Sequence, residues 1–247
     1  MPTSQDQIFA DFEGDRWFAR NNPRPEKFDP ATDPVCRLID LYHLKPRNVI
    51  EVGAANGVRL EAIRQRYHSR VWGIDVSSKA LADGKSRFPQ IQFIRGAAHA
   101  IPTIQSFDLV IINFVFHWID RSNLLRSIAE VDRIVMAGGL LIIGDFYPSN
   151  FIKVRYHHLP DRKVYTYKQN YAEIFAASGL YSHVALLTGT HASGGLESET
   201  SEDHRTGAWL LRKTLDEGYI ERTSRRELPI PPPPGRKPSV GRSRRRP

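Results

Sequence analysis

The chain has 247 residues, of which 40% are hydrophobic and 25% are charged, and its formal net charge is +8. This length and composition fit one α/β domain with a large core. The single cysteine, Cys36, excludes an internal disulfide, and no apolar run approaches the roughly 20 residues of a membrane helix. We therefore expect a soluble, cytoplasmic protein with neither a signal sequence nor a membrane anchor.

Residues 1–32 are expected to form a segment that covers a ligand cleft. They are polar on average but mix aromatic side chains with charges, which is unusual for a free tail: Phe9, Phe12, Trp17 and Phe18. Packing of these aromatics on the outside of a sheet is the alternative. The main domain is expected over residues 33–221, beginning with a helix over Asp33–Leu44 that has Pro34 in its first position.

The stretch Val49–Gly57 predicts a buried strand followed by a tight turn into a helix. Its spacing is Glu-x-Gly-x-x-x-Gly, and Gly53 lets the backbone bend close to a ligand at the carboxyl end of the strand. The nicotinamide-cofactor fingerprint needs another glycine where Ala55 stands. Glu51 would also repel a diphosphate, and it suits a cationic ligand that carries an amino group and a sulfonium.

The next two strands predict a nucleoside site. Arg70–Asp75 ends in an acid 24 residues after Glu51, and a carboxylate there can accept both hydroxyls of a ribose. The third strand, Ile91–Gly96, runs into Ala97 and Ala98. Backbone groups of this stretch can hydrogen-bond the base of a nucleoside ligand.

A mostly apolar run, Phe107–Asn113, predicts a fourth strand buried on both faces. It is followed by the segment Phe114–Ile119. Apolar residues at helical spacing then predict a helix over Leu124–Val135. Gly138 and Gly139 end that helix, and Leu140–Phe146 is a fifth strand.

The remainder predicts a polar insert, a helix and two more strands. His157 and His158 belong with Tyr165, Tyr167 and Lys168 to an insert that is expected to form a substrate wall. The elements expected after it are a helix over Tyr167–Ser178, a strand over Tyr181–Thr188, a loop over Thr190–Arg205 and a strand over Gly207–Lys213. Two strands joined without a helix must be antiparallel. The predicted fold is α/β, a Rossmann-like seven-stranded sheet that is mostly parallel, with an antiparallel last strand and helices on both faces.

All of the excess positive charge lies in residues 222–247, which hold nine Lys or Arg and one acid. Because the remaining 221 residues balance at 26 basic and 26 acidic side chains, the folded body is neutral. The tail is rich in proline and arginine and is expected to be disordered with polyproline II character. Contact with RNA, an acidic membrane or a proline-motif receptor is one alternative, and a dispensable extension is the other.

These features together resemble class I S-adenosylmethionine-dependent methyltransferases. The likeness rests on Glu-Val-Gly-Ala-Ala-Asn-Gly at the end of the first strand, on the acid at Asp75 and on Asn-Phe-Val-Phe-His-Trp at the end of the fourth strand. It also rests on the Gly-Gly pair that precedes the fifth strand and the Asp-Phe pair that ends it. It is strong over residues 45–150 and looser to about 213. A subgroup found with bacterial polysaccharide and natural-product genes is the most similar. The departure is Ala97, where the family often has an acid for the adenine amino group.

The resemblance implies S-adenosyl-L-methionine as the cofactor. The cofactor-binding residues that it and the motif spacing imply are Glu51, Gly53, Ala54, Ala55, Asn56, Gly57, Asp75, Val76, Gly96, Ala97, Ala98, Asn113 and Phe114.

The candidate catalytic residues are His117, His157 and His158. The sulfonium already activates the methyl group, so a base is needed only for a hydroxyl or protonated amine acceptor. His117 ranks first because it follows the fourth strand; the alternative is a histidine that merely packs beside Trp118. No carboxylate or cysteine lies at ligand spacing from the histidines, so no metal site is expected.

The predicted function is methyl transfer to a small polar acceptor, such as a sugar or polysaccharide precursor. One alternative is an RNA or protein methyltransferase that uses the basic tail. Against it, Asn113–Phe116 lacks the Asn/Asp-Pro-Pro-aromatic motif of many nucleic-acid amino methylases, and the body has no basic surplus. The other alternative is a non-catalytic nucleotide-binding module. We expect a small-molecule partner, no nucleic acid and no membrane; acceptor identity and oligomeric state are left open.

Overall fold

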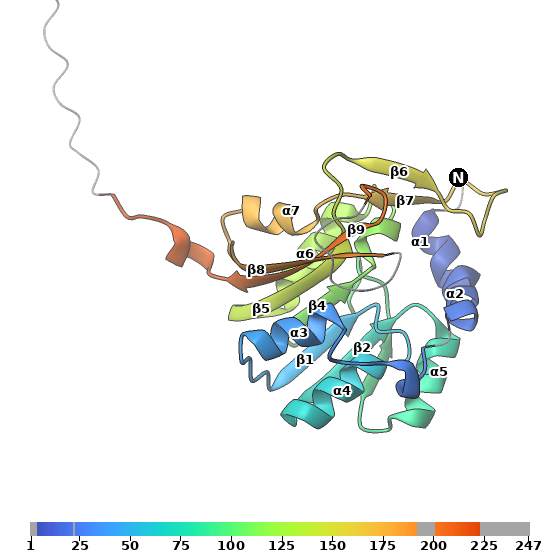
Figure 1. Ribbon diagram of the computed structural model, residues 1–247, viewed down its shortest axis with the longest axis horizontal. Coiled ribbons are helices and arrows are strands. Elements are labelled where there is room, and N and C mark those ends of the chain that lie inside the picture. Colours follow the sequence, from blue (N-terminus) through green and yellow to red (C-terminus); the bar gives the residue numbers. More distant parts are fainter. Residues whose placement is uncertain (1–3, 22, 192–200, 223–247) are drawn as a thin grey trace, which may run out of the picture.

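A computed structural model describes residues 4–21, 23–191 and 201–222. Its centre is a seven-stranded sheet of order β3-β2-β1-β4-β5-β9-β8 (Figure 1). Strands β1 to β5 are parallel, and β9 runs antiparallel to both β5 and β8. This confirms the predicted fold class. The strands are β1 Asn48–Val52, β2 Arg70–Asp75, β3 Gln92–Arg95, β4 Phe107–Asn113, β5 Val135–Phe146, β8 Tyr181–Thr190 and β9 Arg205–Lys213.

Helices cover both faces of the sheet because its buried strands present apolar side chains to each face in turn. Val49 belongs to one core with residues of α3, α4 and α5, while Ile50 belongs to the other with residues of α6 and α7. The α-helices that pack on the sheet are α3 Pro34–Leu41, α4 Val58–Tyr67, α5 Ser78–Arg87, α6 Leu124–Ile134 and α7 Ala172–Ala177. The short turns of helix are η2 Pro25–Lys27, η3 Phe116–Trp118 and η4 Leu215–Gly218.

The first predicted helix begins as expected and ends earlier. Asp33 caps α3 by accepting a hydrogen bond from the Cys36 backbone N–H at 2.9 Å. The helix stops at Leu41, and His43 takes a left-handed backbone conformation with φ of 50°. Cys36 is buried.

The helix expected over Tyr167–Ser178 is wrong in its first part. Tyr165–Lys168 is strand β7, which pairs antiparallel with β6 (Ile152–Arg155), and α7 starts only at Ala172. Alternating side chains favour the strand, since Tyr165 and Tyr167 share one face and hold the cations of Lys153 and Arg121 over their rings. The fifth strand also begins earlier than expected, at Val135.

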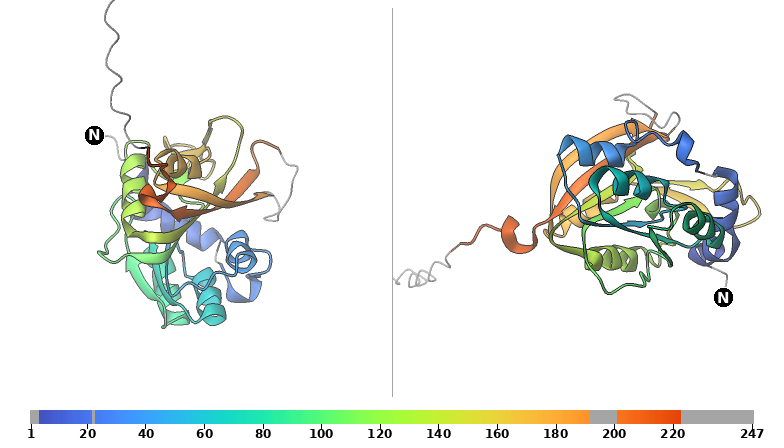
Figure 2. Two further views of the ribbon diagram at one scale, coloured as in Figure 1. Left: turned by 90° about the vertical axis from the view of Figure 1, so that its left-hand side faces the viewer. Right: turned by 90° about the horizontal axis from the view of Figure 1, so that it is seen from below.

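The N-terminal residues fold as α1 (Gln5–Ile8), a π-helical turn η1 (Phe9–Glu13) and α2 (Gly14–Asn21). Asp15 of α2 accepts hydrogen bonds from the Ser77 hydroxyl and the Lys79 backbone N–H at the start of α5. The Gln5 amide donates to the carbonyls of Trp118 and Tyr165. These helices therefore lie at the same end of the molecule as the β6–β7 hairpin (Figures 1 and 2).

Two predicted segments lie largely outside the described residues. The loop expected over Thr190–Arg205 includes residues 192–200, and the tail expected over 222–247 is described only at Arg222. In the part of the chain that is described, none of the helices has both the length and the apolar character needed to cross a membrane.

Gly84→Ala is expected to lower the stability of the fold by about 1–3 kcal/mol, as overpacking of a core does. An added Cβ at Gly84 would lie 2.6 Å from the Phe93 ring and 2.7 Å from the Asn56 carbonyl oxygen. That clash outweighs the roughly 0.5–1 kcal/mol that alanine gains over glycine inside a helix. Thermal unfolding measures the effect. Gly218→Ala is the control, because its nearest atom would lie 3.8 Å away; equal melting temperatures for both variants would contradict the packing.

Candidate active site

A cavity of about 700 Å³ opens at the carboxyl ends of the parallel strands. The turn after β1, the ends of β2 to β5, the β6–β7 hairpin and residues of the N-terminal helices line it. Most of the residues predicted from the sequence share this one cavity: Gly53, Ala54, Ala55, Asn56, Asp75, Val76, Gly96, Ala97, Ala98, Asn113 and Phe114, with His117, His157 and His158. Glu51 and Gly57 are not among the lining residues.

The turn after β1 is shaped by glycine at the two positions that the motif requires. Gly53 and Gly57 both have φ of 79°, a left-handed conformation that favours glycine. A Cβ at Gly53 would lie 2.2 Å from Val115. The backbone N–H groups of Gly53 and Ala54 donate to the Ile74 carbonyl of β2, so the turn is fixed before any ligand binds.

Glu51 lies beneath the turn and not on the cavity wall. It is 1% exposed and forms an ion pair with Arg59 of α4. Arg59 also pairs with Asp33 at 2.9 Å and itself lines the cavity. Burial raises the pKa of the Glu51 carboxyl, and the neighbouring Arg59 opposes that shift. Sequence reasoning missed Arg59, because one arginine on a helix gives no pattern.

Asp75 ends β2 with its carboxyl on the cavity wall. One oxygen accepts a hydrogen bond from the Ala55 N–H and the other from the Ser77 N–H, each at 2.8 Å. Burial raises the pKa of this carboxyl, while the two backbone bonds oppose the shift. A carboxylate has about four lone-pair positions, so both oxygens retain capacity for a ligand.

Asn56 joins the turn to the N-terminal segment. Its amide donates to the Pro23 carbonyl and to Asp83, both at 2.8 Å. Its side-chain oxygen is buried and accepts no hydrogen bond from the described residues.

His117 is held against a buried acid. After β4 the backbone bends at Phe114, which has φ of 54°, and His117 follows in η3. Its Nδ1 lies 2.9 Å from Asp145, and the two side chains are 3% and 0% exposed. The other ring nitrogen makes no hydrogen bond with the described residues, and His117 lines the cavity. A carboxylate that fixes one imidazole nitrogen leaves the other poised as a base. Sequence reasoning named His117 but missed its partner Asp145.

His157 and His158 lie on the rim. Both are exposed, and their ring centroids are 3.9 Å apart in the connection after β6. The pKa of His158 is lowered by partial burial and by the nearby charges of Arg20 and His157. His117, in contrast, is a buried lining residue whose side chain is 3% exposed.

Aromatic side chains form one wall. Phe9 stacks on Trp118 with ring centroids 5.1 Å apart, and Trp17 and Tyr156 meet the same indole edge-on. The Tyr156 hydroxyl donates to Glu13. Phe9, Trp17 and Tyr156 thereby bring the N-terminal helices and the hairpin onto one wall of the cavity.

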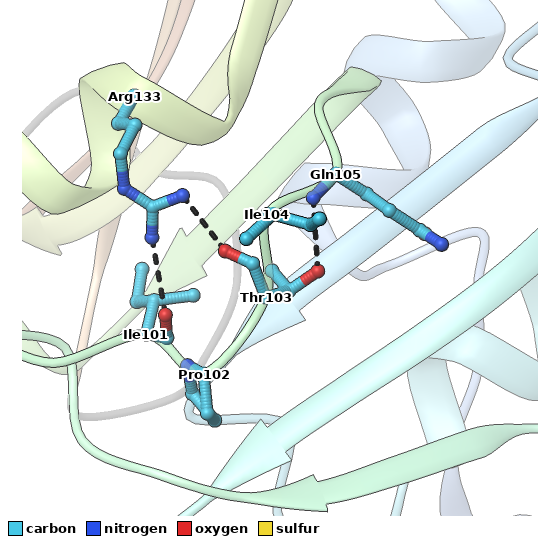
Figure 3. Close-up of a pocket in the computed structure, with 6 residues that line it drawn as sticks. All are labelled: Ile101, Pro102, Thr103, Ile104, Gln105 and Arg133. Carbon is cyan, nitrogen blue, oxygen red and sulfur yellow. Dashed lines mark hydrogen bonds between the residues drawn. The ribbon is translucent and has the colours of Figure 1, made fainter.

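A second depression lies at the opposite, amino-terminal edge of the sheet, where residues 101–105 lead into β4. Figure 3 shows Arg133 donating to the carbonyls of Thr103 and Ile101, at 2.7 and 3.1 Å. The Arg133 guanidinium there holds this loop against α6. Across the described ranges, no group of three or more His, Cys, Asp or Glu side chains is placed to hold a metal ion.

Known proteins share both sequence and fold with this chain. The family model for a methyltransferase domain matches residues 49–139. Malonyl-[acyl-carrier protein] O-methyltransferase 1 of Coxiella burnetii is 30% identical over 119 residues, which are 47% of this chain and 40% of that protein. Demethylmenaquinone methyltransferase of Thermotoga maritima is 30% identical over 118 residues, 46% of this chain and 50% of that protein. The chain thus spans about half or less of the curated relatives that it matches.

Solved structures extend the likeness in fold. The 1,6-didemethyltoxoflavin-N1-methyltransferase of Burkholderia thailandensis, solved with S-adenosylhomocysteine, superposes with a TM-score of 0.63 at 15% identity. The match covers 84% of this chain and 87% of that one. CalS10 of Micromonospora echinaspora, an amino pentose methyltransferase with bound S-adenosylmethionine, gives a TM-score of 0.57 at 13% identity over 81% of this chain and 97% of that one.

Proposed function

Because the chain carries a methyltransferase domain of the class I, S-adenosylmethionine-dependent type, we propose that it transfers a methyl group from S-adenosylmethionine to a small polar acceptor. The observation that carries the proposal is the shared cavity. It brings the glycine turn, Asp75 and His117 together at the carboxyl ends of the parallel strands.

The cavity fits this cofactor group by group. Asp75 offers a carboxylate to the two ribose hydroxyls. The Arg59 guanidinium on the cavity wall suits the cofactor's carboxylate. Backbone groups of Gly96 to Ala98 remain for the adenine edge. Beneath the turn, Glu51 and Asp33 both pair with Arg59 and hold its guanidinium in place.

When bound, S-adenosylmethionine supplies a methyl group already activated by its sulfonium. The protein's task is to orient the acceptor and to exclude water. We assign His117 as the base that removes the acceptor proton, with Asp145 fixing its ring. The N-terminal segment of residues 1–32 is proposed as the cover that excludes water, and His157 and His158 as rim groups that contact the acceptor.

A sugar is the acceptor class that we favour. Carbohydrate rings present C–H faces that pack on aromatic side chains, and hydroxyls that need polar partners. The stacked wall of Phe9, Trp17 and Trp118 faces the same cavity as the polar hairpin. The names of the curated relatives give different acceptors, a malonyl-[acyl-carrier protein] and demethylmenaquinone, which fits an acceptor side that differs between members of one fold.

Calorimetric titration tests the cofactor. S-adenosylmethionine and S-adenosylhomocysteine are expected to bind in the micromolar range, about −8 kcal/mol, whereas NAD is expected not to bind. Ala55 in place of the middle glycine and the acidic pair beneath the turn disfavour a diphosphate. Comparable binding of NAD with none of the sulfonium compound would overturn the proposal.

A further inference from the structure

Lys168 is a buried cation on the acceptor side of the cavity. It is 9% exposed, and it lies on β7 with Thr166, both facing the cavity. Its ammonium donates to the Asp203 backbone carbonyl at 2.5 Å. The Asp203 carboxylate is 3.5 Å away and 63% exposed, and it is the one acid paired with Lys168 among the described residues. An ammonium has three donors and is costly to bury without acceptors, so Lys168 retains capacity for an anion.

The ring of Phe146 places this ammonium beside the proposed base. Its centroid lies 4.5 Å from the Lys168 nitrogen and 5.2 Å from the centroid of the His117 imidazole. Lys168 and His117 therefore both pack against one ring, and both line the same cavity.

His191 adds a neutral hydrogen-bond group to the same place. Its ring packs on Phe146 and Phe114, with centroids 5.1 and 5.3 Å away. Burial lowers the pKa of His191, and the nearby His117, His204 and Lys168 lower it further. A neutral imidazole can donate one N–H to an anion without a second desolvated charge.

Positive charge, like that of Lys168, also lies at the opening of the cavity. Arg155 stands on the rim with His157 and His158. Among the described residues that line the cavity, the acids are Asp6 and Asp75, which belong to α1 and β2, and Asp203. A cationic amine acceptor would meet repulsion on this side, whereas an anion would meet attraction.

We propose that the acceptor carries an anionic group, a carboxylate or a phosphate, which binds at Lys168 and His191 and so places the nucleophilic atom at His117. The inference rests on the proposed function, because it assigns the acceptor class of that same site. It narrows the sugar class to acidic sugars, such as hexuronic acids or sugar phosphates.

The test is calorimetric titration of the full-length protein saturated with S-adenosylhomocysteine, using D-glucuronate, D-glucose 6-phosphate and D-glucose as probes. We expect at least one of the two anions to bind at least tenfold more tightly than glucose, and the better anion identifies carboxylate or phosphate. Lys168→Met should weaken that anion at least tenfold and leave glucose unchanged. Lys163→Met is the matched control, an exposed lysine before the same strand that does not line the cavity, and should change neither.

Two further variants separate charge from folding. Lys168→Arg keeps the cation and should keep the preference for the anion. Asp203→Asn removes the competing carboxylate and should not weaken the anion. Equal binding of glucose and both anions, no saturable binding of either anion, or full anion binding by Lys168→Met would overturn the inference. Failure to bind S-adenosylhomocysteine in the first titration would instead overturn the proposed function.

Discussion

His117→Gln is expected to slow methyl transfer to a hydroxyl acceptor by about 10²–10⁴-fold, the usual contribution of a positioned base. The substitution keeps a polar side chain of similar size but removes the imidazole that Asp145 orients. Formation of S-adenosylhomocysteine in the presence of an acceptor measures the rate. Cofactor affinity should stay within about threefold, since the base acts on the acceptor.

Asp145→Asn should slow the same step, because an amide can present its N–H to the imidazole and favour the wrong tautomer. Asp145 is a positioning residue, and it also accepts hydrogen bonds from the backbone N–H groups of His117 and Phe146. Added imidazole should restore part of the activity of His117→Ala and none of that of Asp145→Asn. His183→Gln, an exposed histidine on β8, is the control. Unchanged rates in both His117 variants would remove this histidine from the chemistry.

Asp75→Ala is expected to weaken S-adenosylmethionine binding at least tenfold. Each lost charge-assisted hydrogen bond to the ribose is worth about 1.5–3 kcal/mol. Ala97→Asp, by contrast, adds one acid near the adenine edge and should change affinity by less than about threefold. Calorimetry compares the two variants with the parent protein.

The local role of Asp75 requires its own control. The carboxylate also holds the N–H groups of Ala55 and Ser77, so the alanine variant loses contacts within the turn. Asp75→Asn keeps one acceptor oxygen and the side-chain size, and its affinity should fall between those of Asp75→Ala and the parent. Melting temperatures without cofactor report the structural part. An unchanged dissociation constant in Asp75→Ala would mean that this carboxylate does not bind the ribose.

The fold could be predicted because its strands and turns are encoded locally. Phe107–Asn113 is a mostly apolar run, and the structure has β4 over the same residues. Gly53 and Gly57 occupy left-handed positions that few other residues tolerate. The direct connection between the last two strands required antiparallel pairing, which the register confirms.

The hairpin and the charge pairs could not be predicted, because they depend on contacts between distant residues. Tyr165–Lys168 is too short to distinguish strand from helix until β6 pairs with it. Asp145 contacts His117 although 28 positions separate them in the sequence. Arg59 of α4 forms ion pairs with Glu51 of β1 and with Asp33, which caps α3. Nothing in the spacing of those residues marks them as partners. Lys168 belonged to a predicted substrate wall, yet its burial against Phe146 follows only from the fold.

The N-terminal helices touch both halves of the cavity, and this makes the two halves thermodynamically linked. On one side Asp15 binds the start of α5, and Arg95 at the end of β3 donates to the Ala10 carbonyl. On the other, Glu13 accepts from Tyr156 and Gln5 donates to Tyr165. A molecule that orders this segment from the β2 side lowers the entropic cost of ordering it against the hairpin. We therefore expect that, where binding orders this segment, occupancy of either half favours occupancy of the other by the same factor, a reciprocal cooperativity that needs no movement of the sheet.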